Sequence, residues 1–139
     1  LEIFRTHCAG LLACQSGEGL WHQLLDRNDS YLESSATAMF VYGFARGINR
    51  GWLDAKAYGP AALLGWNALG TQINNIGQIE NVCVGTGVSY EPAYYYNRHV
   101  HPYTAHGYGP VLMAGSEMLA LLDGFDIHQS TAIYFYDRK

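Results

Sequence analysis

The pattern of apolar and polar positions repeats along the chain. A one-sided helix is followed by a short extended segment and then by a helix that is apolar nearly all round, first over residues 1–50 and again over residues 54–123. Helical hairpins of this kind stack only against neighbours. A helix without a polar face cannot be an exposed end, so two copies leave apolar surface on both flanks. The pattern therefore predicts an arc of a ring.

The first copy divides into three predicted elements. Apolar residues at helical spacing indicate an outer helix over residues 1–15, and an extended piece follows over residues 20–25. Residues 30–33 have the spacing of a capping box, in which Ser30 and Glu33 satisfy backbone donors at a helix start. The run 36–45 lacks a polar side, which predicts an enclosed inner helix.

The second copy begins at Asp54, which is expected to cap another outer helix. Gly59 and Pro60 should bend or delay that helix. Pro110 fits the first turn of a closing inner helix. Weak alternation over residues 131–136 predicts a final strand.

The connection inside the second copy is long. Alternation over residues 76–84 predicts a short strand, and residues 85–109 follow as an aromatic loop too long for a plain connector, which favours a functional role. His99, His101 and His106 lie in this loop. Hydrogen bonding within the loop explains them better than zinc, because no carboxylate or cysteine nearby completes a ligand set, and we expect no metal.

Composition favours a carbohydrate ligand. The 139 residues are 49% hydrophobic and include eleven Tyr and three Trp, but only 14% are charged. Large amphipathic rings suit a concave surface as well as a core. Sugars bind to such surfaces.

Charge and length exclude other partners. Eight basic residues against twelve acidic ones give a net charge of -4, with no basic stripe for phosphates, so we expect no nucleic acid partner. No apolar run approaches the roughly 18 residues of a membrane span, so we expect no membrane partner. The start of the chain lacks Met and a signal-peptide layout, which indicates a true N-terminus elsewhere.

Three cysteines, Cys8, Cys14 and Cys83, have no metal spacing, and we predict no disulfide. They are expected to be small buried hydrophobes. Cytoplasm and periplasm both tolerate such thiols, so the compartment stays open.

The candidate site lies where outer helices lead into inner ones. Trp21 and His22 occupy this junction in the first copy, and His106 occupies it in the second. In a ring, these junctions converge on one mouth, so Trp21 and His106 are predicted to open onto one cavity. Inner-helix N-termini point donors there, which suits an anionic sugar.

No carboxylate pair looks committed to glycoside chemistry, which commonly needs two. Glu33 is explained by the capping box, Asp54 by a cap, Asp26 and Asp29 by a turn, and Glu91 by an exposed loop. We therefore expect no catalytic residue in this chain.

Several ordered motifs resemble one enzyme family. They are Gly19-Leu20-Trp21-His22-Gln23-Leu24-Leu25-Asp26, Ser30-Tyr31-Leu32-Glu33-Ser34-Ser35-Ala36-Thr37-Ala38-Met39-Phe40, Arg50-Gly51-Trp52-Leu53-Asp54, Cys83-Val84-Gly85-Thr86-Gly87, Tyr94-Tyr95-Tyr96-Asn97-Arg98 and His106-Gly107-Tyr108-Gly109-Pro110. Together they are similar to the unsaturated glucuronyl and rhamnogalacturonyl hydrolases, glycoside hydrolase families 88 and 105.

The resemblance implies an all-α fold, with helical hairpins forming part of an (α/α)6 toroid and short β segments in the connecting loops. Residues 1–139 would be one partial domain, the C-terminal hairpins of that toroid. The family removes the unsaturated uronyl residue left by polysaccharide lyases by hydrating its double bond, with an Asp as acid and base and without a metal or organic cofactor. Its catalytic Asp residues lie in earlier hairpins.

The resemblance also implies substrate-binding residues. Trp21 and His22 would line the pocket at one junction and His106 at the other, with Glu33 and Ser34 at the inner-helix mouth. The partner would be an oligosaccharide, and the missing N-terminal hairpins or another copy would cover the apolar flanks.

Two hypotheses of different classes follow. The chain is part of a hydrolase acting on unsaturated uronyl oligosaccharides, or it is a non-catalytic helical-repeat module that binds carbohydrate or a partner protein. Another (α/α)6 enzyme, such as a polysaccharide lyase, is disfavoured by the ordered motifs.

Overall fold

The computed structural model describes residues 1–129 and 134–139, and these residues are mostly helical. The helices are α1 Glu2–Ala13, α2 Ser34–Asn49, α3 Ala55–Gly70, α4 Pro92–Tyr96, the 3-10 turn η1 Ala105–Gly107 and α5 Tyr108–Gly124. The strands are β1 Trp21–His22, β2 Leu32–Glu33, β3 Phe125–Gln129 and β4 Tyr134–Arg138. The predicted all-α class with short β segments is confirmed.

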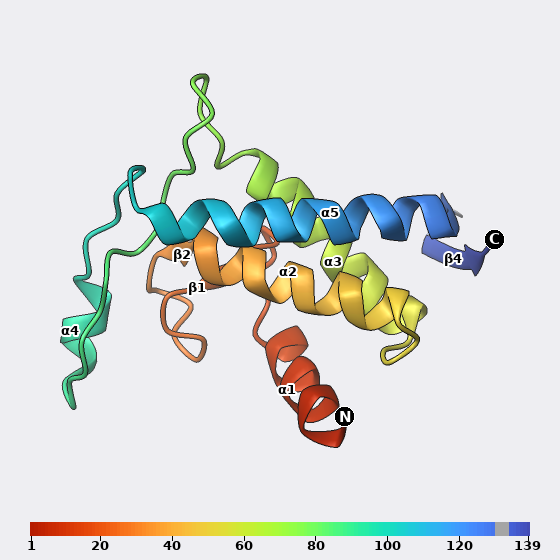
Figure 1. Cartoon of the computed structure of the whole chain (residues 1–139). Coiled ribbons are helices and arrows are strands. Elements are labelled where there is room, and N and C mark those ends of the chain that lie inside the picture. Colours follow the sequence, from red (N-terminus) through yellow and green to blue (C-terminus); the bar gives the residue numbers. More distant parts are fainter. Residues whose placement is uncertain (130–133) are drawn as a thin grey trace.

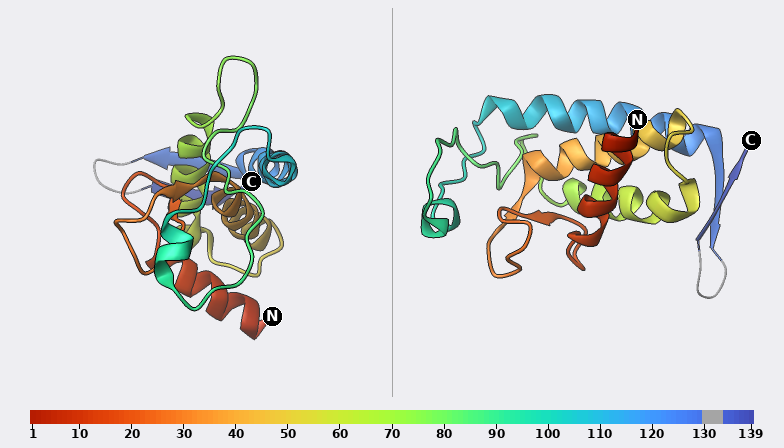
Figure 2. Two further views of the ribbon diagram at one scale, coloured as in Figure 1. Left: turned by 90° about the vertical axis from the view of Figure 1, so that its left-hand side faces the viewer. Right: turned by 90° about the horizontal axis from the view of Figure 1, so that it is seen from below.

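Two helical hairpins lie side by side (Figure 1). Helices α2 and α5 run next to each other in the same direction, while α3 packs behind them in the opposite direction. The view along this stack in Figure 2 shows α1 beneath α2, at the edge of the molecule. The order α1–α2 and α3–α5 therefore gives two outer-to-inner pairs, as expected of an arc of an (α/α)6 toroid.

Helix α2 is the centre of the core. Val41, Phe44 and Ile48 on this helix have 0–1% of their surface exposed. A methyl group added to Gly65 of α3 would lie 2.7 Å from Val41, so α2 and α3 approach closely at this glycine. Close packing on more than one side explains why the α2 sequence has almost no polar face.

The starts of α2 and α3 differ from the predicted ones in detail. Glu33, not Ser30, caps α2, because its carboxylate accepts from the backbone of Ala36, and the capping-box prediction is wrong. Asp54 caps α3 as predicted. That helix begins at Ala55 with Pro60 inside it, so the proline does not delay it.

The connection from α3 to α5 also departs from expectation. Residues 76–84 form no strand. In its place the structure has two isolated β-bridges, Ile73 to Ile79 and Cys83 to Val100. The segment 85–109 is not one loop, since α4 and η1 interrupt it. Pro110 lies in the first turn of α5, as predicted.

The chain ends in an antiparallel hairpin of β3 and β4, paired from Phe125 with Arg138 to Gln129 with Tyr134. The strand predicted over residues 131–136 overlaps β4, and residues 131–133 lie outside the described ones. Phe125 and Tyr136 are buried. A methyl group added to Gly59 of α3 would lie 2.6 Å from the Tyr136 ring, so the hairpin packs directly on α3.

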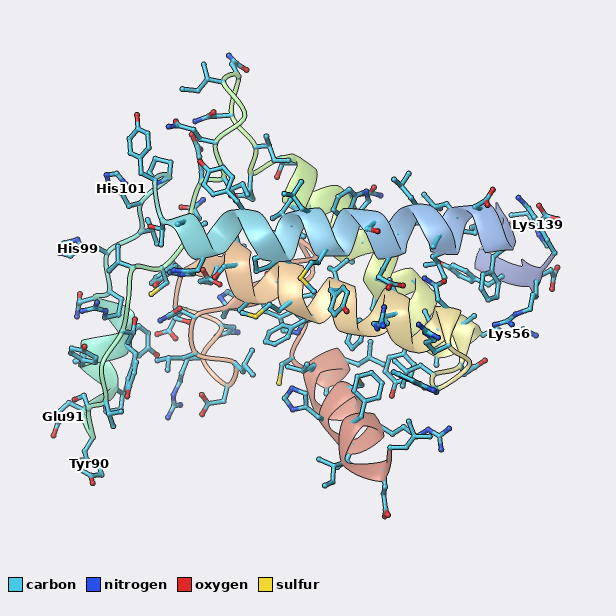
Figure 3. All side chains as sticks on the ribbon, in the orientation of Figure 1. Lys56, Tyr90, Glu91, His99, His101 and Lys139 are labelled. Carbon is cyan, nitrogen blue, oxygen red and sulfur yellow. The ribbon has the colours of Figure 1, made fainter. Side chains whose placement is uncertain are left out.

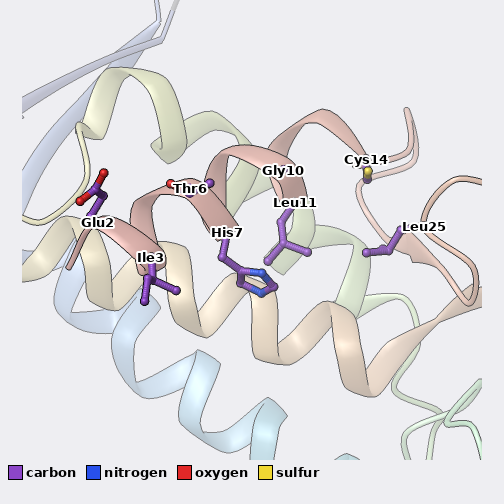
Figure 4. Close-up of a pocket in the computed structure, with 8 residues that line it drawn as sticks. All are labelled: Glu2, Ile3, Thr6, His7, Gly10, Leu11, Cys14 and Leu25. Carbon is purple, nitrogen blue, oxygen red and sulfur yellow. The ribbon is translucent and has the colours of Figure 1, made fainter.

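Two flanks expose apolar surface. On α5, Leu112 and Leu119 are 75% and 71% exposed, seven residues apart on one face. On the other flank an open groove of about 660 Å³ runs along α1, lined mainly by apolar atoms (Figure 4). Within the described chain, no helix combines the length and hydropathy that spanning a membrane requires.

Candidate functional site

The two outer-to-inner junctions meet at one end of the molecule. Helices α2 and α5 begin at the same end, where β1, β2 and the segment around Cys83 lie (Figure 1). Figure 3 shows Lys56 and Lys139 at the opposite end. The predicted site residues therefore come from neighbouring elements, and the hydrogen bonds of each residue decide its role.

Trp21 belongs to the core. Its side chain has no exposed surface, its ring packs edge-on against Phe40 and Phe44, and its indole N–H donates to the Leu11 carbonyl at 2.7 Å. The predicted opening of Trp21 onto a cavity shared with His106 is therefore wrong in this structure. Trp21 supports the junction from beneath, because it links α1 and α2.

Glu33 is buried, with 3% of its surface exposed, and all its contacts are structural. One carboxylate oxygen accepts from the Cys83 backbone at 2.9 Å and from the Ser35 hydroxyl at 2.8 Å. The other accepts from the Ala36 backbone at 2.5 Å. Glu33 thus caps α2 and holds a segment fifty residues away.

Ser34 holds the same segment. Its hydroxyl donates to the Glu80 carbonyl at 2.7 Å, and its backbone N–H donates to the Asn81 carbonyl at 3.0 Å. Asn81 has φ 56°, a left-handed conformation that asparagine tolerates better than most residues. Ser34 has no exposed surface, and both predicted residues of the inner-helix mouth bond to the segment of residues 80–83.

His106 and His22 differ in their surroundings. The His106 ring is exposed, and its Nε2 lies 2.9 Å from the Cys83 carbonyl oxygen. His22 is half-buried, with Nδ1 2.5 Å from the Ser30 carbonyl oxygen. His22 lines a hollow of about 460 Å³ with residues 13–16 and with Leu25, Asp26 and Asn28, and His106 is not among the lining residues. The structure brings both histidines to one end, and the hollow that His22 lines does not include His106.

A group around the Cys83 thiol was not identified from the sequence. Burial first, and then the neighbouring Cys83 thiol, raise the pKa of Tyr31 well above its usual range. The Cys83 thiol also lies 3.3 Å from the Thr86 hydroxyl and 3.5 Å from the Gln23 amide. The motif that begins at Cys83 drew attention to this segment in the sequence. The contacts of Cys83 with residues distant in the chain leave no pattern from which they could be predicted.

The aromatic loop is held by its own tyrosines. The Tyr94 hydroxyl accepts from the Gly87 backbone, and the Tyr95 hydroxyl bonds to the Ser89 backbone. The Tyr96 hydroxyl donates to Asp29 at 2.8 Å, which ties the loop to the first junction and raises the pKa of Tyr96. All three hydroxyls hold the loop.

Arg98 closes this loop on its other side. Its guanidinium lies over the Tyr94 ring, 5.1 Å from the centroid, and donates to the Gly85 carbonyl and the Thr86 hydroxyl. The cation also favours ionisation of nearby Tyr31, although less than burial opposes it. Arg98 therefore fixes the position of the Gly85–Thr86 turn.

The other loop histidines lie outward. Figure 3 shows His99 and His101 beyond the start of α5, on the loop that leads to it. His101 accepts from the Tyr103 backbone at 3.1 Å. Among the described residues, no three His, Cys, Asp or Glu side chains gather in a way that would hold a metal ion.

The inner helices are joined by a charged contact away from the junctions. Glu117 of α5 accepts from Arg46 and Asn49 of α2. Burial alone would raise the pKa of Glu117, but the hydrogen bonds from Asn49 and Arg46 and the charges of Arg46 and Arg50 together lower it. The Glu117 carboxylate therefore joins the two inner helices, which is a structural role like that of Glu33.

Comparison with known proteins gives the family context. A family profile described as Glycosyl Hydrolase Family 88 matches residues 1–122. An unsaturated 3S-rhamnoglycuronyl hydrolase from Formosa agariphila is 32% identical over 125 residues, covering 86% of this chain and 31% of that protein. The chain thus spans about a third of the length of this curated relative.

Solved structures share the fold. A possible member of the GH105 family from Salmonella enterica has a TM-score of 0.81 and 28% identity, covering 85% of this chain and 31% of that one. A structure titled as a polysaccharide lyase has a TM-score of 0.72 and 30% identity, covering 88% of this chain and 35% of that one. Proteins described by different activities share this fold, so the residues of the site must decide the chemistry.

Proposed function

Because this chain belongs to Glycosyl Hydrolase Family 88, we propose that it forms two hairpins of a hydrolase that removes unsaturated uronyl residues from lyase-generated oligosaccharides, such as unsaturated rhamnogalacturonan. The single observation that carries the proposal is its similarity, at 32% identity, to the Formosa agariphila enzyme, whose name states this type of activity. A fold shared with the (α/α)6 enzymes supports it.

The proposed reaction adds water across the double bond of the uronyl ring. A carboxylic acid protonates one carbon of the double bond, and water, losing a proton to the carboxylate, bonds to the other. The resulting hemiketal opens, its ring C–O bond breaks, and the sugar alcohol leaves. The sum is one water consumed and one glycosidic link cleaved, with no oxidant or metal.

The proposed role of this chain is the wall of the substrate mouth. His22 and His106 would contact the sugar, while Glu33 and Ser34 hold the backbone around them. The acid and base would come from hairpins outside residues 1–139, since Glu33, Asp54 and Glu117 are each committed to caps or to contacts between elements. On its own the chain is then inactive.

Those further hairpins would also cover the flanks. The exposed leucines of α5 and the groove along α1 are apolar and lie on opposite flanks. Contiguous exposed apolar surface is uncommon on a complete domain. A second copy of the chain is the other occupant that we consider.

The alternative function is a non-catalytic module that binds carbohydrate or a partner protein. Two observations support this alternative. The carboxylates named above cap helices or join elements, and the connection before α5 is rich in tyrosine. It predicts sugar binding by the chain alone and no gain of activity on completion of the ring.

A chimera separates the two functions. The chain replaces the segment that it matches in the Formosa agariphila enzyme, and the fall in ultraviolet absorbance of an unsaturated uronyl oligosaccharide measures hydrolysis. We expect activity from the chimera and none from the 139-residue chain. A folded chimera without activity, under conditions where the parent enzyme turns over, contradicts the proposal. Binding of the same oligosaccharide by the isolated chain in calorimetry would then favour the module.

A further inference from the structure

The backbone of one residue, Cys83, joins the two junctions. The Cys83 N–H donates to the Glu33 carboxylate at 2.9 Å, and the Cys83 carbonyl lies 2.9 Å from Nε2 of His106. Cys83 is buried, as is Glu33. The path from the cap of α2 to the ring before α5 therefore runs through two hydrogen bonds and a single residue.

The chemistry of a carbonyl fixes the proton on the His106 ring. A carbonyl oxygen only accepts, so Nε2 must carry the hydrogen. In the neutral ring the other nitrogen, Nδ1, is then an acceptor. Among the described residues, no hydrogen bond to Nδ1 of His106 is present, and the ring is exposed.

We propose that His106 binds a sugar hydroxyl through an unprotonated Nδ1, and that Glu33 is a positioning residue that sets this tautomer by holding the Cys83 backbone in place. This inference rests on the proposed function for the identity of the ligand. An acceptor nitrogen takes a hydrogen bond from a hydroxyl and offers none to a carboxylate. His106 thus contacts a hydroxyl group of the uronyl sugar. The carboxylate of the sugar is bound by other residues.

His22 supplies an internal reference. Its Nδ1 lies against the Ser30 carbonyl, so the same reasoning gives it the opposite tautomer, with the hydrogen on Nδ1. Its hollow is lined by residues 13–16 and by Leu25, Asp26 and Asn28, and it does not include Cys83. A change at Glu33 should alter the ring of His106 and leave that of His22 as it is.

The first test reads tautomers directly. Long-range proton–nitrogen correlation spectra of the 139-residue chain, or of the chimera if the chain self-associates, identify which ring nitrogen carries hydrogen above the titration range of histidine. We expect hydrogen on Nε2 for His106 and on Nδ1 for His22. Hydrogen on Nδ1 of His106, or two rings of equal mixed tautomers, overturns the proposal.

The second test separates positioning from folding. Glu33→Asp keeps a good N-cap residue but shortens the side chain by one methylene, so the carboxylate no longer reaches Cys83. We expect His106 to lose its preference for one tautomer while His22 keeps its own, which also reports a folded junction. If His106 is unchanged in this variant, Glu33 has no positioning role. Glu80→Asp, at an exposed carboxylate, is the matched control.

The third test reads the ligand contact in the active chimera. His106→Gln keeps a donor for the Cys83 carbonyl but lacks the acceptor at Nδ1, and we expect KM for the unsaturated oligosaccharide to rise about tenfold with kcat little changed, as for one lost hydrogen bond. His128→Gln, on β3 at the far end, is the control. An unchanged KM refutes the contact with the sugar hydroxyl but leaves the proposed activity standing. An inactive chimera whose histidines have the expected tautomers refutes only the proposed activity.

Discussion

The two junctions of this molecule occupy equivalent places in the repeat but are stabilised by different interactions. The first is held by burial, because Trp21 lies fully inside an aromatic cluster with Phe40 and Phe44. The second is held by hydrogen bonds to backbone groups, centred on Cys83. A repeat therefore preserves the position of a junction without preserving the interactions that hold it.

The largest expected effect is at the buried junction. Trp21→Ala removes a fully enclosed ring and should lower the free energy of unfolding by about 3–5 kcal/mol, which urea unfolding of the chain at fixed concentration measures. Trp52→Ala is the matched control, since that ring is 39% exposed, and it should cost much less. Equal losses for the two tryptophans would remove the distinction between the junctions.

The next effect is at the polar junction, where overpacking tests how tightly the backbone is held. Gly107→Ala places a methyl group 2.6 Å from the side chain of buried Val82, a branched residue with little room to move, and should cost about 1–3 kcal/mol. Gly85→Ala in the same connection meets no neighbour within 4 Å and should be near neutral. If both variants unfold at the same urea concentration as the parent chain, the backbone of the second junction is not tightly packed.

A smaller, pH-dependent effect concerns the contact that joins the two hairpins. The pKa of Glu117 is lowered from its ordinary value of 4.5, so the stability it contributes is complete above that value and is lost as pH falls through the lower, folded-state value. Glu117→Gln should cost about 1–2 kcal/mol at neutral pH, discounted for the partial exposure of Arg46.

Comparison of the Glu117→Gln variant with the parent chain in urea at about pH 7 and about pH 3 measures this contribution. The difference between them should shrink at the acidic end. Glu91→Gln, an exposed carboxylate, serves as the control. A difference that grows on acidification contradicts the assignment.

The smallest effect is expected where the junctions touch at the surface. Tyr96→Phe removes the hydroxyl that donates to Asp29, and the exposed position should leave urea unfolding unchanged within error. Spectrophotometric titration should lose one tyrosine that ionises late, because Asp29 raises the pKa of Tyr96. Loss of an ordinary tyrosine signal would show that the two junctions are not joined there.

The sequence predicted features set by neighbouring residues better than those set by contacts distant in the chain. Periodicity located the outer and inner helices, and Asp54 and Pro110 marked helix starts, because these signals are local. Ser30 was misread since its hydroxyl donates to the Arg27 carbonyl and accepts from Leu24 within a turn, leaving Glu33 to cap the helix alone. A carboxylate that accepts from a backbone fifty residues away leaves no local pattern.

The same reason limits the site. His22 and His106 stood out by their place in the repeat, but which ring nitrogen faces a carbonyl depends on tertiary contacts. Trp21 was taken for a pocket wall because an aromatic ring in a junction has the same sequence whether it faces a ligand or the core. Its full burial settles its place in this structure.

The hairpin of β3 and β4 has a consequence for anyone defining the boundaries of this domain. The family profile matches residues 1–122, yet Phe125 and Tyr136 beyond it are buried, and Tyr136 covers Gly59 of α3. An expression clone that ends at residue 122 would remove both rings and expose the part of α3 that Tyr136 covers. A domain boundary drawn from the family match alone would therefore cut through the hydrophobic core.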